Sequence, residues 1–233
     1  MKKTALALGL TAALFTGMAN AHQAGDVILR AGGVFVSANS ESTTKTAVPV
    51  NLEVSDNAQL GLTGTYMFTD NIGLELLAAT PFSHKVKANV PGLNTLTGGA
   101  VGDNLGDVVK VKQLPPSLYL QYYFLDKDAG SRPYLGVGLN YTRFFNAKST
   151  NPLITDVNVK KHSFAPVVNA GIDIKLTDNV YLNTAMWYTR IKTTAKFKVP
   201  AVESLANLPA GYEHEVKLKL DPFVFFAGIA YRF

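Results

Sequence analysis

Residues 220–233 read LDPFVFFAGIAYRF. One parity of this stretch carries apolar and mostly aromatic side chains: Phe223, Phe225, Ala227, Ile229, Tyr231 and Phe233. Side chains of a β-strand alternate between the two faces of a sheet, so the stretch predicts a strand with one continuous apolar face. Aromatic side chains on such a face are typical of strands that meet lipid where hydrocarbon gives way to headgroups.

The same alternation recurs along the chain in seven further segments of about ten residues, a length that suits a tilted strand crossing a bilayer. They are residues 26–37, 59–68, 71–82, 115–124, 132–142, 163–175 and 179–191. Long polar links alternate with short ones such as TDN and DKDAGS, which is typical of an up-and-down barrel. We therefore predict an all-β fold, an eight-stranded antiparallel up-and-down transmembrane β-barrel with both termini on the short-turn side.

The N-terminal stretch MKKTALALGLTAALFTGMANA, residues 1–21, has two lysines, a short apolar run and an Ala-x-Ala site. This pattern predicts a secretory signal peptide rather than a buried helix, with residues 22–233 forming the barrel in a bacterial outer membrane. The chain has no cysteine, so neither a disulfide framework nor a lipid-anchored cysteine is expected. A soluble barrel of the lipocalin type is disfavoured, because water would not tolerate such extensive apolar outer stripes.

The residues expected to face the lumen change character along the barrel. Near the short-turn end they are charged, and we expect their opposite charges to form ion pairs that close the lumen floor: Arg30, Glu75, Asp173 and Arg232. Further up they are apolar, which predicts a hydrophobic channel: Leu77, Ala79, Tyr119, Phe144 and Trp187. An eight-stranded barrel holds only its own side chains or one small ligand, so a water-filled pore is not expected.

Prolines mark the upper ends of the third and fourth predicted strands, at Pro81, Pro115 and Pro116. Proline removes a ladder donor and is normally kept out of central strands. One hypothesis is a lateral opening between these two strands; the alternative is that the prolines merely end them. The link 88–110, rich in Gly and Asn, is interpreted as a mobile cover over the mouth of the channel.

Several stretches resemble the outer membrane protein W family, which includes OmpW, OprG and AlkL. They are LGLTGTYMFTDNIGLELLAATPFSHKV, QLPPSLYLQYYF, RPYLGVGLNYTRFF, LNTAMWY and LDPFVFFAGIAYRF. The resemblance implies an eight-stranded barrel with a hydrophobic upper channel, a lateral exit, and a gate pair that corresponds to Leu77 and Trp187. Phe164 stands where the family usually has Trp followed by Gly, and Pro166 is expected to interrupt that strand, so we expect the shape of the upper pocket to depart from the family's.

Sites for chemistry are not evident. The four histidines are too few and too scattered for a metal motif: His22, His84, His162 and His214. Three of them, His84, His162 and His214, are expected near the outer rim. No nucleophile–base pair is recognisable, although a Ser–His pair could assemble in the fold. We therefore expect no metal, no cofactor and no enzymatic activity.

The formal net charge is +5, and many lysines are expected at the outer strand ends: Lys85, Lys87, Lys110, Lys112, Lys160, Lys161, Lys196, Lys198, Lys217 and Lys219. They suit anionic lipopolysaccharide, or simply a solvated rim, and nothing indicates nucleic acid. Phe233 resembles the terminal signal read by the barrel-assembly machinery. The leading hypothesis is passive uptake of small hydrophobic molecules; the alternative is a surface structural or receptor protein of the stress-response or phage and colicin receptor type.

Overall fold

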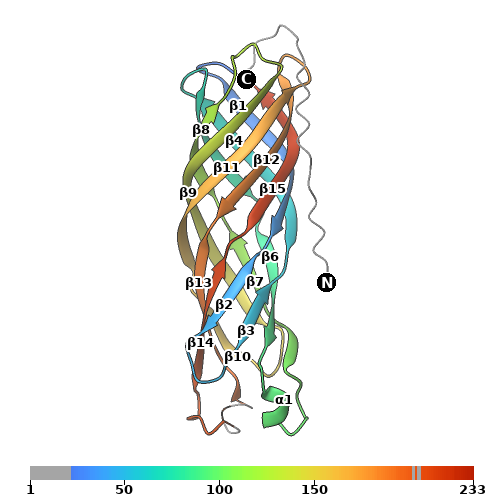
Figure 1. The fold of residues 1–233 in the computed structure, drawn as a ribbon, viewed down its shortest axis with the longest axis vertical. Helices are drawn as coiled ribbons and strands as arrows, with labels where there is room; N and C mark the ends of the chain where they lie inside the picture. Colours follow the sequence, from blue (N-terminus) through green and yellow to red (C-terminus); the bar gives the residue numbers. More distant parts are fainter. Residues whose placement is uncertain (1–21, 201–202, 204–205) are drawn as a thin grey trace.

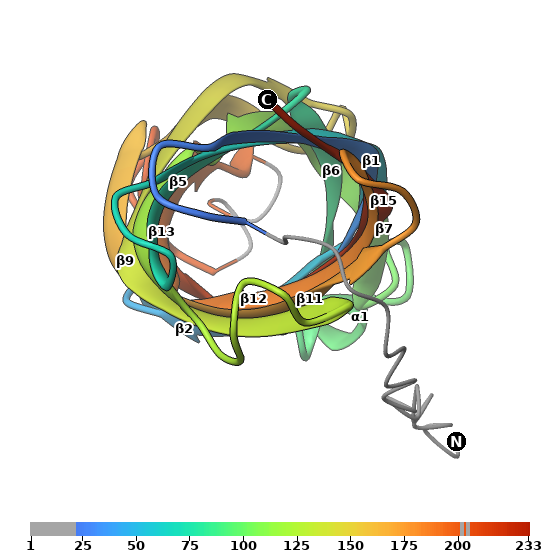
Figure 2. The same ribbon diagram turned by 90° about the horizontal axis from the view of Figure 1, so that it is seen from above.

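The computed structural model describes residues 22–200, 203 and 206–233 and shows an elongated β-barrel (Figure 1). The predicted signal peptide, residues 1–21, lies outside the described residues. Eight strands pair antiparallel into a closed ring, seen end-on in Figure 2. In ring order they are β1 (Val27–Ser37), β4 (Asn57–Met67), β5 (Ile72–Ala79), β8 (Ser117–Tyr123), β9 (Ser131–Ser149), β11 (His162–Lys175), β12 (Val180–Thr189) and β15 (Phe223–Arg232).

This ring confirms the eight-stranded up-and-down barrel, and each predicted segment contains or overlaps one of its strands. The outward parity is apolar around the ring and includes Leu62, Leu118, Leu139 and Ile229. The short turns after β4, β8 and β11 lie at the same end as the C-terminus, at the top of Figure 1. Among the described residues, no helix has the length and hydropathy to cross a membrane.

The prediction of long polar links was wrong for most of their length, because these segments are strands that extend the barrel outward. They are β2 (Ser40–Thr44), β3 (Asn51–Val54), β6 (Phe82–Asn89), β7 (Asn104–Leu114), β10 (Thr155–Val159), β13 (Ile191–Lys198) and β14 (Glu213–Leu220). Even the segment interpreted as a mobile cover contains most of β7 and the single-turn helix α1 (Leu93–Leu96). We call this part of the molecule, the lower half in Figure 1, the extension.

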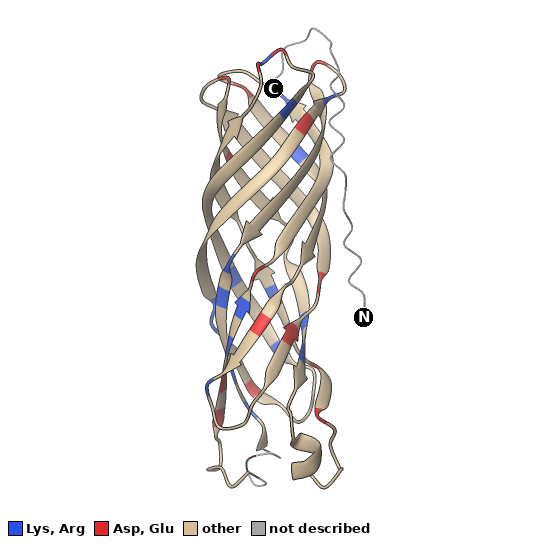
Figure 3. Ribbon diagram, in the orientation of Figure 1, with Lys and Arg blue, Asp and Glu red and all other residues tan. Residues whose placement is uncertain are grey.

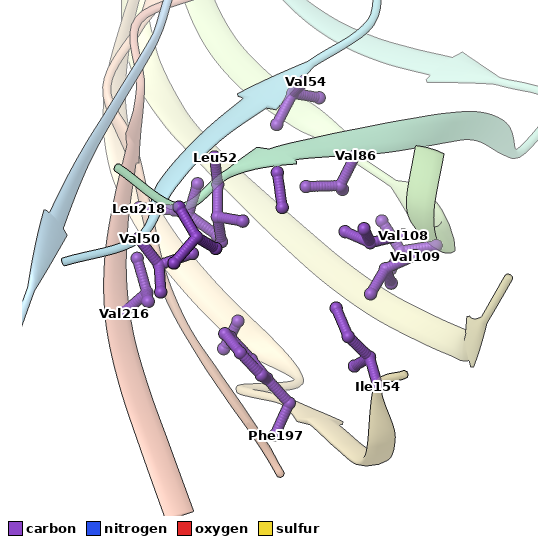
Figure 4. Packing of buried hydrophobic residues seen from close by; sticks show 14 of the residues in the cluster. Val50, Leu52, Val54, Val86, Val108, Val109, Ile154, Phe197, Val216 and Leu218 are labelled. Atoms are coloured by element: carbon purple, nitrogen blue, oxygen red, sulfur yellow. The ribbon is translucent and has the colours of Figure 1, made fainter. Parts of the chain in front are cut away.

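The extension has the opposite polarity to the membrane barrel. Its inward residues form an apolar cluster that includes Val86, Val111, Phe197 and Leu218 (Figure 4). Its outward residues are polar, and Figure 3 shows charged residues gathered on this half and at the turns of the other end. Water therefore replaces lipid as the surroundings at the junction, and the hydrophobic face moves from the outside of the barrel to its interior.

Two neighbouring strands change their pleat phase where this reversal occurs. In β5 the even-numbered side chains face outward, as Leu76 does with 51% exposure, whereas in β6 they face inward, as Val86 does with 6%. The alternation therefore shifts by one residue around Pro81. A matching shift separates β3 from β4, whereas β12 and β13 keep one phase throughout.

Closure of the barrel between its first and last strands depends on a glycine pair. Gly32 in β1 lies directly opposite Gly228 in β15. A Cβ atom added to Gly32 would lie 2.2 Å from the carbonyl oxygen of Ala227. Since this contact is with backbone, the two strands would have to move apart to admit even a methyl group.

We predict that Gly32→Ala destabilises the folded barrel by about 1–3 kcal/mol, the usual cost of overpacking a tight interior. The measurement is urea unfolding of the protein refolded into lipid vesicles, followed by migration on unboiled gels. Gly33→Ala is the matched control, because a Cβ at Gly33 would contact nothing within 4 Å. Equal stability of the two variants would contradict the argument.

Candidate functional site

The inner end of the lumen is closed by a buried ion cluster centred on Arg30. Its Nη1 donates to Glu75 Oε2 at 2.5 Å, and its Nη2 and Nε donate to the Asp173 carboxylate at 2.6 and 3.2 Å. All three side chains are almost fully buried. Because charged groups are costly to bury without partners, this bidentate arrangement stabilises a closed floor.

Further polar groups complete the hydrogen bonds of these carboxylates. Glu75 accepts from Thr65 Oγ1 and from the hydroxyl of Tyr119. Asp173 accepts from Asn183 Nδ2 at 2.8 Å. The floor is thus a connected network rather than an isolated pair, which gives it little freedom to open.

His22 and Arg132 belong to this floor, although the sequence did not indicate either as part of it. His22 Nε2 lies 2.8 Å from Asp173 Oδ2, and Arg132 Nη1 donates to the carbonyl oxygen of His22 at 2.7 Å. The start of the described chain turns inward across the end of the ring in Figure 2. Strand parity could have found Arg132, but His22 precedes the first strand and has no periodicity to reveal it.

Arg232 requires a correction, because the structure does not bring it into the Arg30 cluster. Arg232 on β15 lies opposite Ile28 on β1. Ile28 is the inward residue next to Arg30 on the side of the short turns. Arg232 Nη1 lies 3.7 Å from Asp26 Oδ2, and its Nη2 donates to the carbonyl oxygen of Asp178. The inward parity was assigned correctly, but parity alone does not give height along the barrel.

Above the floor lies an apolar cavity of about 40 Å³, which we call the inner cavity. Leu77, Ala79 and Trp187 line it together. Tyr119 separates it from the floor, since the ring packs edge-on against Trp187 at 6.5 Å between centroids while the hydroxyl binds Glu75. The apolar constriction and the polar floor therefore meet at this one tyrosine.

Phe144 lies further out and lines a second cavity of about 50 Å³ inside the extension, the middle cavity. The inner and middle cavities share four lining residues: Val36, Gln113, Ile191 and Pro222. A third, outer cavity of about 20 Å³ lies beside α1 and shares Ile154 and Phe197 with the middle one. Through these shared residues the three largely apolar cavities follow one another as a column between α1 and the floor.

The hydrogen-bonded ladder of the wall is interrupted beside the inner cavity. Between β5 and β8 it ends at the pair Leu77–Ser117, and between β6 and β7 it resumes at Phe82–Gln113. The unpaired stretch contains the three prolines singled out in the sequence: Pro81, Pro115 and Pro116.

The other edge of β8 remains closed in the same region. Asn140 Nδ2 donates to the carbonyl oxygen of Pro115 at 3.2 Å, and the backbone nitrogen of Tyr141 donates to that of Pro116 at 2.9 Å. The interruption is therefore one-sided, which gives the wall a weak seam facing β5.

Apart from His22, the histidines do not gather at one site, and Phe164, at the departure from the family pattern, lies outside the lumen. His84 and His214 are buried at different heights, whereas His162 is exposed and stacks on Tyr141. Among the described residues, no group of three His, Cys, Asp or Glu side chains is placed to hold a metal. Phe164 is 76% exposed on the outside of β11, so it faces away from the pocket it was expected to shape.

Comparison with known proteins gives a consistent result. The sequence profile of the OmpW family matches residues 23–233. Outer membrane protein W of Vibrio cholerae serotype O1 is 40% identical over 237 residues and covers 100% of both chains. The crystal structure of OprG from Pseudomonas aeruginosa superposes with a TM-score of 0.78 at 32% identity, covering 92% of this chain and 99% of that one.

A more distant relative has an informative name. The dibenzothiophene metabolism operon protein PahQ of Pseudomonas aeruginosa is 26% identical over 156 residues, or 67% of each chain. The closed barrel, its apolar outer face and these matches together place the protein in the bacterial outer membrane. The chain belongs to the OmpW family of outer membrane proteins.

Proposed function

We propose that this protein carries small hydrophobic molecules passively through the outer membrane and releases them sideways through the proline seam. The observation that carries the proposal is the column of three apolar cavities that ends on a sealed polar floor. The extension keeps this apolar space surrounded by a polar outer wall, so a solute is shielded from the hydrophilic layer outside the bilayer.

The floor determines the direction of release. To continue along the axis, an apolar molecule would have to displace the Arg30 cluster and leave buried charges without partners, which is strongly unfavourable. Sideways, the ladder is already interrupted between Leu77 and Phe82. Release into the membrane therefore needs fewer broken hydrogen bonds than release into the periplasm.

One relative supports an apolar cargo, and the passive movement of such a cargo needs no enzymatic activity. The name of PahQ connects that relative with an operon for the metabolism of dibenzothiophene, a fused aromatic molecule. Passive movement of such a solute requires no nucleophile, metal or cofactor. The gate residues Leu77, Ala79 and Trp187 would act by shape and polarity alone.

Phe233 supports a second proposed contact, with the barrel-assembly machinery. The side chain is exposed and packs against Tyr231, and the backbone nitrogen of Phe233 donates to the carbonyl oxygen of Val27 at the closing seam. An exposed aromatic on the last strand is available to a partner before β1 and β15 pair.

A basic surface supports lipopolysaccharide as a further partner. Lys110 of β7 lies directly opposite Lys85 of β6 on one side and Lys148 of β9 on the other. All three are exposed, and Asp107 lies 3.0 Å from Lys85. Like charges opposite each other destabilise a sheet, so an anion over the row would be stabilising. Lys148 was not singled out in the sequence.

We predict that Leu77→Gln lowers the uptake of a sparingly soluble aromatic hydrocarbon by tenfold or more, because an amide in the inner cavity must be desolvated as the solute passes. Leu77→Met preserves volume and hydrophobicity and should retain near-normal uptake. Uptake is measured as oxidation by intact cells, with total enzyme measured in permeabilised cells. Unchanged uptake in Leu77→Gln would favour the alternative, a surface receptor or structural role.

We also predict that a disulfide that clamps the outer end of the seam restricts release. The pair Ser83–Lys112 joins β6 to β7 just beyond the interruption, and the chain has no other cysteine to interfere. The doubly substituted Cys protein should lose most uptake when oxidised and recover it when reduced. The matched control is the pair Thr194–Lys217 between β13 and β14, where oxidation should change nothing. Equal behaviour of the two would exclude this seam as the exit.

For the basic surface, replacing Lys85, Lys110 and Lys148 together by Gln should weaken binding of purified lipopolysaccharide about tenfold to hundredfold, since each lysine near an anionic surface contributes about 1 kcal/mol. The assay is titration calorimetry of the refolded protein in detergent. The control replaces Lys196, Lys198 and Lys219, which already have carboxylate partners within the chain. The same loss in both triple variants would show that only net charge matters.

A further inference from the structure

Gln113 is a polar residue placed in otherwise apolar space. It lies on β7, two residues before Pro115, and is 5% exposed. It lines both the inner and the middle cavity. A solute that moves from the extension toward the seam must therefore pass this side chain.

The orientation of the Gln113 amide is fixed by its neighbours. His84 Nδ1 lies 2.7 Å from the carbonyl oxygen of Ser55, and His84 Nε2 lies 2.9 Å from Gln113 Nε2. A carbonyl oxygen only accepts, so Nδ1 carries the proton and Nε2 is left as an acceptor. Gln113 must then donate through its amide nitrogen, which leaves its Oε1 as the remaining acceptor.

That acceptor, Gln113 Oε1, is buried and is left without a hydrogen bond in the part of the chain that the structure describes. The other oxygen-bearing side chains that line the inner and middle cavities all form hydrogen bonds within the chain: Ser117, Asn140, Thr189 and Thr193. An unpaired buried acceptor is unfavourable, and the position of this one between two cavities points to a ligand donor that completes it.

The neutral state of the His84 imidazole keeps the Gln113 amide in one orientation. Burial lowers the pKa of His84, so the imidazole stays neutral near neutral pH. A neutral ring keeps Nε2 available to the amide nitrogen of Gln113 and holds Oε1 in place.

We propose that Gln113 Oε1 is a binding subsite for solutes that combine an apolar body with one uncharged O–H or N–H donor, such as aryl and alkyl alcohols. The proposal rests on the proposed function and narrows its cargo. A hydrocarbon leaves the acceptor unpaired, whereas an alcohol satisfies it, so binding distinguishes the two. A charged donor is excluded because the surrounding walls are apolar and cannot replace its hydration.

The fluorescence of Trp187 provides a direct readout, because this is the one tryptophan of the chain and it lines the inner cavity. The probes are 4-nitrobenzyl alcohol and its methyl ether, two nitroaromatic quenchers that differ in the donor hydrogen. Affinities of both are measured on the full chain refolded in detergent. Changing Gln113 to Leu should shift the ratio of the two affinities about threefold to tenfold toward the ether.

Val111→Ala is the matched control, because Val111 lies on the same inward face of β7 and has no polar group. This variant should leave the ratio unchanged even if both affinities fall. An unchanged ratio in Gln113→Leu, with both probes still binding, would overturn the donor subsite and leave hydrophobic binding intact. Failure of both probes to quench Trp187 in the unsubstituted protein would overturn the proposed function as well.

Discussion

The pairing of backbone groups in lipid is the constraint on which the rest of the structure depends. No water reaches the hydrocarbon region, so every backbone N–H and C=O there must find a partner within the sheet. Closure of β1 on β15 meets this requirement and brings Gly32 against Gly228. A closed ring of eight strands leaves a lumen too narrow for an aqueous pore, and its interior must therefore be filled either by paired charges or by apolar side chains.

Both solutions occur, at different heights. The Arg30 network fills the inner end, and mostly apolar side chains line the remainder as far as the outer tip. Tyr119 belongs to both parts through its hydroxyl and its ring. The ladder is incomplete beside Pro81, which follows β5, and Pro115 and Pro116, which precede β8, at the height of the inner cavity.

The strands of the membrane barrel were predictable because lipid imposes a strict alternation that any one segment displays, as Leu118 and Leu120 do in β8. The extension was missed because its lysines, as in EVKLKL, were assigned to the outer ends of the membrane strands, and the buried alternation of Val216 and Leu218 between them was not followed further. Parity identified Glu75 and Asp173 correctly as inward residues. Parity gave neither the height of Arg232 along the barrel nor the contact of His22 with Asp173, since both depend on contacts between distant segments.

The shift of pleat phase around Pro81 limits the changes in chain length that the fold tolerates. The link between β5 and β6 fixes which side chains of β6 face the cavities and which face water. Adding or removing one residue there would turn Val86 and Ala88 outward and bring Lys85 and Lys87 inward. Substitutions in this link preserve the phase, whereas single-residue insertions and deletions reverse it.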